Sequence, residues 1–196
     1  MLYIISRAIF YSILKLFFGY KIVGREFVPK KGGCILAGNH LSYIDPAVLG
    51  CGCARRISFM AKEELFRKFF ARVWLAGVGA FAVKRNVADL SALKEALKRV
   101  KEGGVLALFP EGGRVQDTFS SKPHAGIGFL AVKLDCPVIP VFIEGTDKVL
   151  PGGVKFIRFH QVSVRYGRPI QIDKLKDYGA IAQDIMQGIR DLALEQ

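Results

Sequence analysis

A histidine and an aspartate five residues apart are the first candidates for chemistry in this sequence. His40 follows a short apolar run, Cys34–Gly38, which is predicted to be a buried strand. Polar residues at the carboxyl end of such a strand stand where α/β sheets place their ligand sites. If the chain turns after His40, the Asp45 carboxylate can reach one imidazole nitrogen and fix the tautomer, which leaves the other nitrogen as a general base. Asp45 also precedes Pro46, so we expect it to cap a helix, and a structural histidine beside a capping aspartate is an equally typical interpretation of the pair.

Two further strand ends carry charged side chains and glycines. These residues are Lys84, Arg85, Glu111, Gly112, Gly113 and Arg114. Glycines at such a turn let backbone N–H groups approach an anion, and an arginine such as Arg114 can hold a phosphate through two parallel hydrogen bonds. Taken singly, either stretch is equally typical of a solvated loop or strand terminus. In a parallel sheet, however, the carboxyl ends of the strands lie at one edge, so we expect these residues and His40 to converge there.

Alternating strands and helices must position those side chains. Short apolar runs predict strands at Tyr20–Val23, Cys34–Gly38, Ile57–Met60, Ala80–Val83, Val105–Phe109, Val138–Ile143 and Gln161–Tyr166. Helical stretches are predicted near Asp45–Leu49, Glu63–Leu75, Leu90–Lys101, Gly126–Leu134 and Lys174–Leu194. This alternation indicates an α/β fold with a mixed, mainly parallel sheet flanked by helices. We predict one such domain over residues 20–196, preceded by a membrane-interacting helix over residues 1–19.

The chain is both basic and apolar. It has 196 residues, a formal net charge of +12 and 51% hydrophobic residues, which excludes a disordered or fibrous protein because so much apolar surface must be buried. Residues 1–85 carry 14 of the 29 basic side chains but only 4 of the 17 acidic ones. Such a charge distribution favours a nucleic acid, an anionic membrane surface or an acidic small substrate as partner.

Two segments of the basic half are candidates for membrane contact. Residues 1–20 are rich in aromatic and aliphatic side chains and contain no acidic residue, but Arg7 and Lys15 argue against a simple transmembrane span. We therefore expect a helix that lies in the membrane interface, with a core-packing first helix as the alternative. Residues 62–76 place Phe and Trp opposite Arg and Lys, which is typical both of a membrane-surface helix and of an amphipathic helix over a sheet.

The four cysteines, Cys34, Cys51, Cys53 and Cys136, form no Cys-x-x-Cys pair. Buried free thiols in a reducing compartment are the expected interpretation. Together with the basic, apolar N-terminal part, this predicts a protein associated with the cytoplasmic face of a membrane.

At this point the sequence resembles the glycerolipid acyltransferase superfamily, specifically the 1-acyl-sn-glycerol-3-phosphate acyltransferases. His40–Asp45 matches the family's first block, in which four residues separate a histidine from an aspartate. The second, third and fourth blocks are similar to Gly79–Arg85, Phe109–Arg114 and Val138–Val141. The blocks occur in the family's order. The departures are Gly113, where threonine is common, and Val115, where serine is common, so a hydroxyl that helps to bind phosphate is missing.

The resemblance implies transfer of a fatty acyl group from an acyl thioester to the free hydroxyl of 1-acylglycerol 3-phosphate, which forms phosphatidic acid. The thioester would be on coenzyme A or on acyl carrier protein, and no metal ion or other cofactor is implied. His40 would take the proton from the hydroxyl and Asp45 would stabilise the imidazolium.

The resemblance also implies roles for the other strand ends. Arg85 and Arg114, aided by Lys84, would hold the substrate phosphate. Glu111 would orient the glycerol or an arginine, and backbone N–H groups at Gly112 and Gly113 would bind phosphate or a developing oxyanion.

Three competing interpretations remain at this stage. Ser42 lies two residues from His40 and is a rival covalent nucleophile, although the sequence lacks a Gly-x-Ser-x-Gly elbow. A non-catalytic lipid-surface protein would keep the fold and the phosphate pocket. Nucleic-acid binding draws on the net charge alone, because no stacking surface or recognition-helix pattern accompanies it, so we expect no nucleic-acid partner.

Overall fold

Seven strands form one sheet in the computed structural model, which describes residues 1–84, 89–151 and 156–195. The strands are β1 (Lys21–Val23), β2 (Cys34–Gly38), β3 (Ile57–Lys62), β4 (Ala80–Val83), β5 (Val105–Leu108), β6 (Val138–Glu144) and β7 (Ser163–Tyr166). Their order is β1-β7-β6-β2-β5-β3-β4, and all neighbours are parallel except β6 and β7. The predicted single α/β domain with a mixed, mainly parallel sheet is confirmed.

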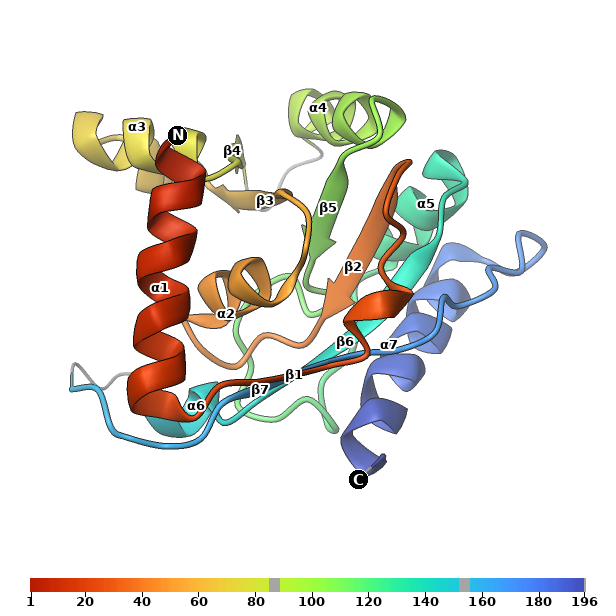
Figure 1. Ribbon diagram of the computed structural model, residues 1–196. Helices are drawn as coiled ribbons and strands as arrows, with labels where there is room; N and C mark the ends of the chain where they lie inside the picture. The colour runs from red at the N-terminus through yellow and green to blue at the C-terminus, as the bar shows by residue number, and fades with distance from the viewer. Residues whose placement is uncertain (85–88, 152–155, 196) are drawn as a thin grey trace.

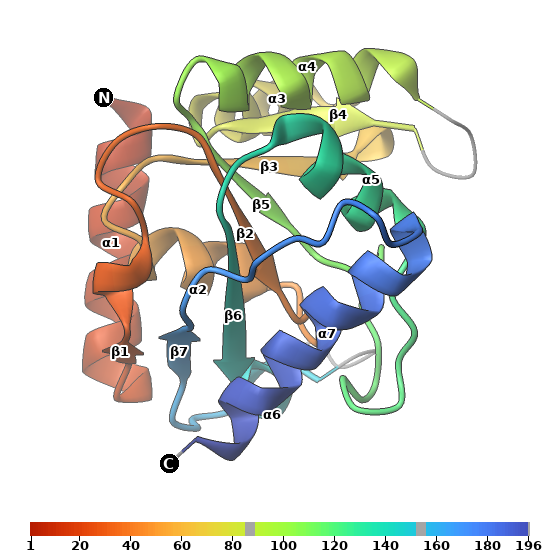
Figure 2. The ribbon, with the colours of Figure 1, turned by 90° about the vertical axis from the view of Figure 1, so that its right-hand side faces the viewer.

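Helices cover both faces of this sheet. They are α1 (Leu2–Phe18), α2 (Asp45–Gly52), α3 (Phe69–Gly77), α4 (Leu90–Lys101), α5 (Ala125–Leu134), α6 (Thr146–Val149) and α7 (Tyr178–Leu194), with short 3-10 turns η1 (Arg25–Phe27) and η2 (Glu63–Phe66). Helices α1 and α2 lie on one side of the sheet, and α4, α5 and α7 lie on the other (Figures 1 and 2).

The central strand β2 shows why the strands read as continuous apolar runs. All five of its residues are buried. Cys34 and Leu36 pack into the core beneath α1 and α2, whereas Ile35 and Ala37 pack into the core beneath α5 and α7. A strand covered on both faces needs apolar side chains at every position, because successive residues point to opposite faces. This makes β2 a rigid support for the residues that follow it.

The N-terminal helix α1 is present as predicted, and it packs along α2 through a narrow inner face. Leu14 and Phe18 are its buried residues, and the helix ends at Gly19, which adopts the left-handed conformation with φ of 51°. The rest of α1 is largely exposed. No helix among the described residues is both long enough and apolar enough to cross a bilayer.

The predicted helix over residues 62–76 is broken in two. Residues Glu63–Phe66 form η2, and Lys68 adopts an extended conformation before α3 begins at Phe69. The break lets α3 contact α1, where the Trp74 indole Nε1–H donates a 3.2 Å hydrogen bond to the Ser6 hydroxyl. A contact between segments so far apart in the chain leaves no local signal, so the periodicity of residues 62–76 could not predict the break.

The last helix begins later than predicted. Asp177 is its N-cap, and its carboxylate accepts hydrogen bonds from the backbone N–H groups of Gly179 and Ala180. Residues 174–176 therefore precede α7 (Tyr178–Leu194), and the C-terminal bound of the helix is as predicted.

Candidate active site

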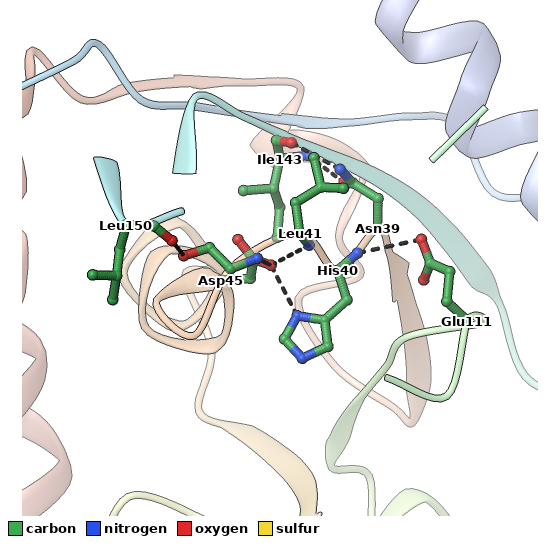
Figure 3. A network of polar contacts seen from close by, with 8 residues as sticks. Asn39, His40, Leu41, Asp45, Glu111, Ile143 and Leu150 are labelled. Atoms are coloured by element: carbon green, nitrogen blue, oxygen red, sulfur yellow. Dashed lines mark hydrogen bonds and ion pairs between the residues drawn. The ribbon is translucent and has the colours of Figure 1, made fainter. Parts of the chain in front are cut away.

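Asn39 fixes the point at which the chain leaves the sheet. Pairing between β2 and β6 ends at Gly38. Beyond that point the Asn39 side chain, in place of a backbone, forms the hydrogen bonds to β6. Its Nδ2 donates to the Ile143 carbonyl at 2.9 Å, and its Oδ1 accepts from the Ile143 N–H at 2.7 Å (Figure 3). With both backbone groups of Ile143 satisfied, the chain can turn away from the sheet at His40 without leaving a buried polar group unpaired.

Replacing Asn39 with alanine is expected to lower the free energy of unfolding by about 2–4 kcal/mol, because two buried backbone groups lose their partners. Urea denaturation of the wild type and the variant measures this difference. Gln187→Ala is the matched control, since it removes an exposed amide that donates to Asp191, and it should cost less than about 0.5 kcal/mol. Equal losses in the two variants would contradict the role given to Asn39.

The predicted contact between His40 and Asp45 is present. His40 Nδ1 lies 2.8 Å from Asp45 Oδ2, and the same oxygen accepts hydrogen bonds from the backbone N–H groups of Leu41 and Ser42, each at 2.7 Å (Figure 3). Asp45 is fully buried, whereas the His40 ring reaches a cavity. With Nδ1–H directed at the carboxylate, Nε2 carries the lone pair and can accept a proton from a molecule in that cavity.

The expectation that Asp45 caps a helix is wrong. Helix α2 begins at Asp45 itself, with Ile44 as its N-cap and no capping hydrogen bond from a side chain. The carboxylate instead turns back toward the loop before the helix, because the imidazole and two backbone N–H groups of that loop converge on one of its oxygens. Asp45 therefore holds the His40 imidazole in place and does not cap α2.

Strand β5 lies beside β2 and supports His40 from the other side. The Phe109 ring stacks on the imidazole, with centroids 4.2 Å apart and planes at 19°. The Glu111 carboxylate accepts a 3.3 Å hydrogen bond from the His40 backbone N–H. Glu111 is buried and does not line the cavity, so the structure places it behind the histidine rather than beside a phosphate.

Burial, with a smaller contribution from the negative charge of Asp45, raises the pKa of Glu111 to about 7. In the unfolded chain the pKa of this carboxyl is about 4.3. Between that pH and the pKa of the folded protein, Glu111 is therefore protonated in the folded protein and ionised in the unfolded chain. We expect this residue to make the free energy of unfolding fall as pH rises between roughly 4.5 and 7.

Glu111→Gln should remove that part of the pH dependence, because the amide keeps an oxygen for the His40 N–H but cannot ionise. Denaturation curves at pH 5 and pH 7.5 measure it. Glu102→Gln, which changes an exposed carboxylate, should leave the dependence as it is in the wild type. A Glu111→Gln protein with the wild-type dependence would show that the carboxyl titrates normally.

Gly112 makes the turn that follows Glu111. Its φ is +65°, and a Cβ there would lie 2.7 Å from His124 Cδ2, so only glycine fits. The Gly112 N–H donates to the Phe109 carbonyl, which commits it to the turn and not to an anion. Gly112 and Gly113 both line the cavity. The predicted backbone anion site therefore cannot use the N–H of Gly112.

Arg114 and Tyr43 lie together at the cavity. The Arg114 guanidinium carbon lies 3.4 Å from the centroid of the Tyr43 ring, a close cation–π contact, and both residues line the cavity with His40. The contact holds the guanidinium close to the cavity without neutralising it. Sequence reasoning identified Arg114 but missed Tyr43.

The third strand end is only partly described. Lys84 follows β4, its side chain is exposed, and its backbone N–H donates to the Asp89 carboxylate at 2.9 Å. Lys84 is not among the residues lining the cavity, and Arg85 lies outside the described residues. The structure thus brings Arg114 to His40, but it does not bring Lys84 to the cavity.

An apolar cavity of about 740 Å³ extends from His40 between the sheet and the helices α1 and α3. Its apolar wall includes Phe10, Phe59, Met60, Trp74, Leu75, Val78, Ala80, Val83, Ala107 and Leu108, and its polar residues include His40, Tyr43, Arg7, Lys62 and Arg114. A space of this size with a few polar groups suits a largely apolar small molecule. Sequence reasoning did not find it, because its wall joins residues that are far apart in the chain, from Tyr3 to Arg114.

Ser42 and the four cysteines are the remaining candidates, and of these only Cys51 lines the cavity. The Ser42 hydroxyl is buried and donates to the Leu150 carbonyl at 3.0 Å, so it is occupied, and Ser42 does not line the cavity. All four cysteines are free, and Cys34, Cys51 and Cys53 are buried, as expected for structural thiols.

The chain is similar to known proteins in both sequence and structure. Residues 19–144 match a family model described as Acyltransferase. The 1-acyl-sn-glycerol-3-phosphate acyltransferase of Bacillus subtilis is 31% identical over 159 residues, which cover 81% of this chain and 77% of that protein. The enzyme of the same name from Borreliella burgdorferi is 29% identical, with 82% and 66% covered. The crystal structure of the 1-acyl-sn-glycerophosphate (LPA) acyltransferase PlsC from Thermotoga maritima matches with a TM-score of 0.74 and 25% identity, covering 95% of this chain and 79% of that one.

Proposed function

The chain belongs to the Acyltransferase family, and we propose that it moves a fatty acyl group from an acyl thioester to the free hydroxyl of 1-acylglycerol 3-phosphate, forming phosphatidic acid in phospholipid biosynthesis. The observation that carries the proposal is the His40–Asp45 pair, whose histidine lines an apolar cavity together with Arg114. The cavity offers space for an acyl chain, the histidine offers a base, and the arginine offers a partner for phosphate. The names of the relatives support this acceptor.

In the proposed reaction, His40 Nε2 takes the proton of the acceptor hydroxyl as its oxygen attacks the thioester carbonyl carbon. Asp45 stabilises the imidazolium that forms, through the 2.8 Å contact with Nδ1. The tetrahedral intermediate then expels the thiolate, which recovers the proton from His40. The new ester bond replaces the thioester bond, and the enzyme returns to its starting state.

The phosphate of the acceptor would pair with Arg114, and Arg85, which follows β4 in the sequence, is a further proposed partner. The donor would be acyl-CoA or acyl carrier protein, and both are acidic, so the net charge of +12 does not separate them. No metal ion enters this proposal, since the histidine supplies the base and the thiolate is a good leaving group.

The proposed partner of the whole protein is an anionic membrane surface at the cytoplasmic face, where the lysophospholipid is delivered. The apolar side chains of α3 support this. Phe69 and Phe70 are 63% and 85% exposed, and the helix buries no residue, unlike an amphipathic helix packed over a sheet. The cations Arg67, Lys68 and Arg72 are exposed beside them.

A comparison of acceptors tests the proposal. Turnover with one acyl donor is measured with lysophosphatidate, glycerol 3-phosphate and a lyso-aminolipid, each at several concentrations. We expect the highest kcat/KM with lysophosphatidate, because it offers both a phosphate for Arg114 and an acyl chain for an apolar surface. A rate no better with lysophosphatidate than with the other two would overturn the assignment of the acceptor. An absence of transfer to all three would favour a non-catalytic lipid-binding protein.

Tyr43→Leu is expected to raise KM for lysophosphatidate about two- to fivefold, because the guanidinium of Arg114 loses the ring that holds it. Tyr43→Phe is the control, since it keeps the ring and should leave KM unchanged. Steady-state kinetics with varied lysophosphatidate measures both variants. A rise in KM for Tyr43→Phe as well would show that the hydroxyl, and not the ring, is what matters.

A further inference from the structure

One face of α1 is an unbroken stripe of exposed aliphatic side chains. The stripe consists of Leu2, Ile5, Ile9, Ile13 and Leu16, spaced three or four residues apart, with exposed fractions between 38% and 77%. Residues at this spacing lie on one side of a helix. Since a 17-residue helix is about 25 Å long, the stripe forms an extended apolar line across the molecule.

Helix α1 contacts α3 toward its N-terminal end, through Ser6 and Phe10, which are not part of the stripe. The rings of Phe10 and Trp74 lie 6.4 Å apart, and Trp74 also donates to the Ser6 hydroxyl. The exposed apolar side chains of α3 therefore continue the surface of α1 at that end.

A second apolar group lies at the opposite end of α1. Phe156, Ile157 and Phe159 are 81%, 62% and 76% exposed. The Phe159 ring lies 6.2 Å from that of Phe17 and stacks on that of Phe18 at 5.9 Å. We call Phe17, Phe156, Ile157 and Phe159 the distal anchor.

The backbone around the distal anchor is held in place. The Arg158 N–H donates to the Val149 carbonyl at 2.8 Å, and the Val162 N–H donates to the Phe18 carbonyl at 3.0 Å. These bonds tie the segment to α6 and to the end of α1, so the large apolar side chains are displayed from a fixed position. A contiguous apolar surface of this kind marks an interaction site.

The charge of these segments indicates what that site meets. Residues 1–20 and 156–172 contain no acidic residue, and they supply the exposed cations Lys15 and Arg158. Aromatic and aliphatic side chains flanked by cations are the composition of a surface that enters the interface of an anionic bilayer. In Figure 1, α3 and the segment that begins at Phe156 project to the same side of the molecule, near opposite ends of α1.

We propose that the distal anchor enters an anionic lipid surface, and that it acts with α3 to hold α1 along the plane of the bilayer. Two contacts at opposite ends of α1 fix the tilt of the protein, and they keep the cavity between α1 and α3 facing the lipid that carries the acceptor. This inference rests on the proposed function in one respect, namely that the acceptor is a lipid of the same surface. The contact with lipid requires no catalysis.

Fluorescence of a relocated tryptophan tests the distal anchor directly. Trp74 is the single tryptophan, so Trp74→Phe/Phe156→Trp places the one indole in the anchor. Vesicles of phosphatidylcholine and phosphatidylglycerol with brominated acyl chains should quench this indole strongly. Trp74→Phe/Leu194→Trp, with the indole at an exposed position on α7, should be quenched little. Equal quenching of the two proteins, or none in either, would overturn the proposal.

Vesicle sedimentation with the double variant Phe156→Ser/Ile157→Ser gives the second measurement. Both side chains are mostly exposed, so the fold keeps its packing, and Phe159 is left in contact with Phe18. We expect about tenfold weaker binding to the anionic vesicles, against less than twofold for the control Leu175→Ser/Leu194→Ser. Wild-type binding by the anchor variant would contradict the proposal.

Two controls distinguish contact with lipid from a change in catalysis and from self-association of the protein. Transfer to a short-chain, monomeric lysophosphatidate should be unchanged in the anchor variant, and it reports on the proposed function independently of binding to vesicles. A lipid-free wild-type dimer that the anchor variant abolishes would overturn the proposal, because a second copy of the chain would then cover this surface.

Discussion

Replacing His40 with alanine is expected to lower kcat for acyl transfer by about 10²- to 10⁴-fold, with little change in KM for either substrate. The side chain supplies the base for the acceptor hydroxyl, and Phe109 and Asp45 hold its ring against the cavity. Release of free thiol from the acyl thioester gives the rate. His160→Ala, which removes an exposed histidine of another loop, should keep the wild-type kcat. A His40→Ala protein with a tenth or more of wild-type activity would exclude His40 as the base.

The same assay separates the base mechanism from a covalent one. Ser42→Ala should retain most of the activity, because the hydroxyl is buried and already donates to the Leu150 carbonyl. If Ser42 were the nucleophile, this variant would be inactive and the wild type would accumulate an acyl-enzyme detectable by mass spectrometry.

Asp45→Asn is expected to lower kcat by at least about 10²-fold and also to destabilise the fold. One oxygen of Asp45 accepts three hydrogen bonds, from His40 Nδ1 and from the N–H groups of Leu41 and Ser42. An amide that turns its NH₂ toward those donors repels them, and an amide that turns its oxygen toward them lacks the charge that stabilises the imidazolium. Kinetics and urea denaturation of the same preparation measure both effects.

Asp177→Ala is the matched control for that variant, because it removes a capping carboxylate. Its carboxylate also accepts backbone N–H groups, those of Gly179 and Ala180, but it caps α7 far from His40 in the sequence. It should lower stability and leave kcat unchanged. If Asp45→Asn likewise lowered stability alone, Asp45 would be a structural residue and not a partner in the reaction.

The strands could be predicted because their signal is local. A strand covered by helices on both faces, such as β2 or β6, needs an apolar residue at every position, and an uninterrupted apolar run reveals it. The contact of His40 with Asp45 was also local, since only four residues intervene. The spacing made the contact one of two equally typical interpretations, and the structure decides between them.

The remaining features depend on contacts between distant segments. Asp45 does not cap α2, because the loop from His40 to Ser42 offers its carboxylate three donors. Glu111 looked like a ligand for substrate, yet it is buried against the backbone of His40, 71 positions away. The cavity arises where α1 and α3 meet over the sheet, and the Ser6–Trp74 contact that joins them has no signature in either segment.

The most direct test of the central claim is the stoichiometry of products. Purified protein is mixed with acyl-CoA or acyl carrier protein thioester and lysophosphatidate, and free thiol, phosphatidic acid and free fatty acid are quantified together. We predict one phosphatidic acid for each thiol released by the wild type, and both products formed at least about 10²-fold more slowly with His40→Ala. Thiol release matched by free fatty acid, with no phosphatidic acid, would contradict the account, because the cavity and its histidine would then direct water rather than a lysophospholipid to the thioester.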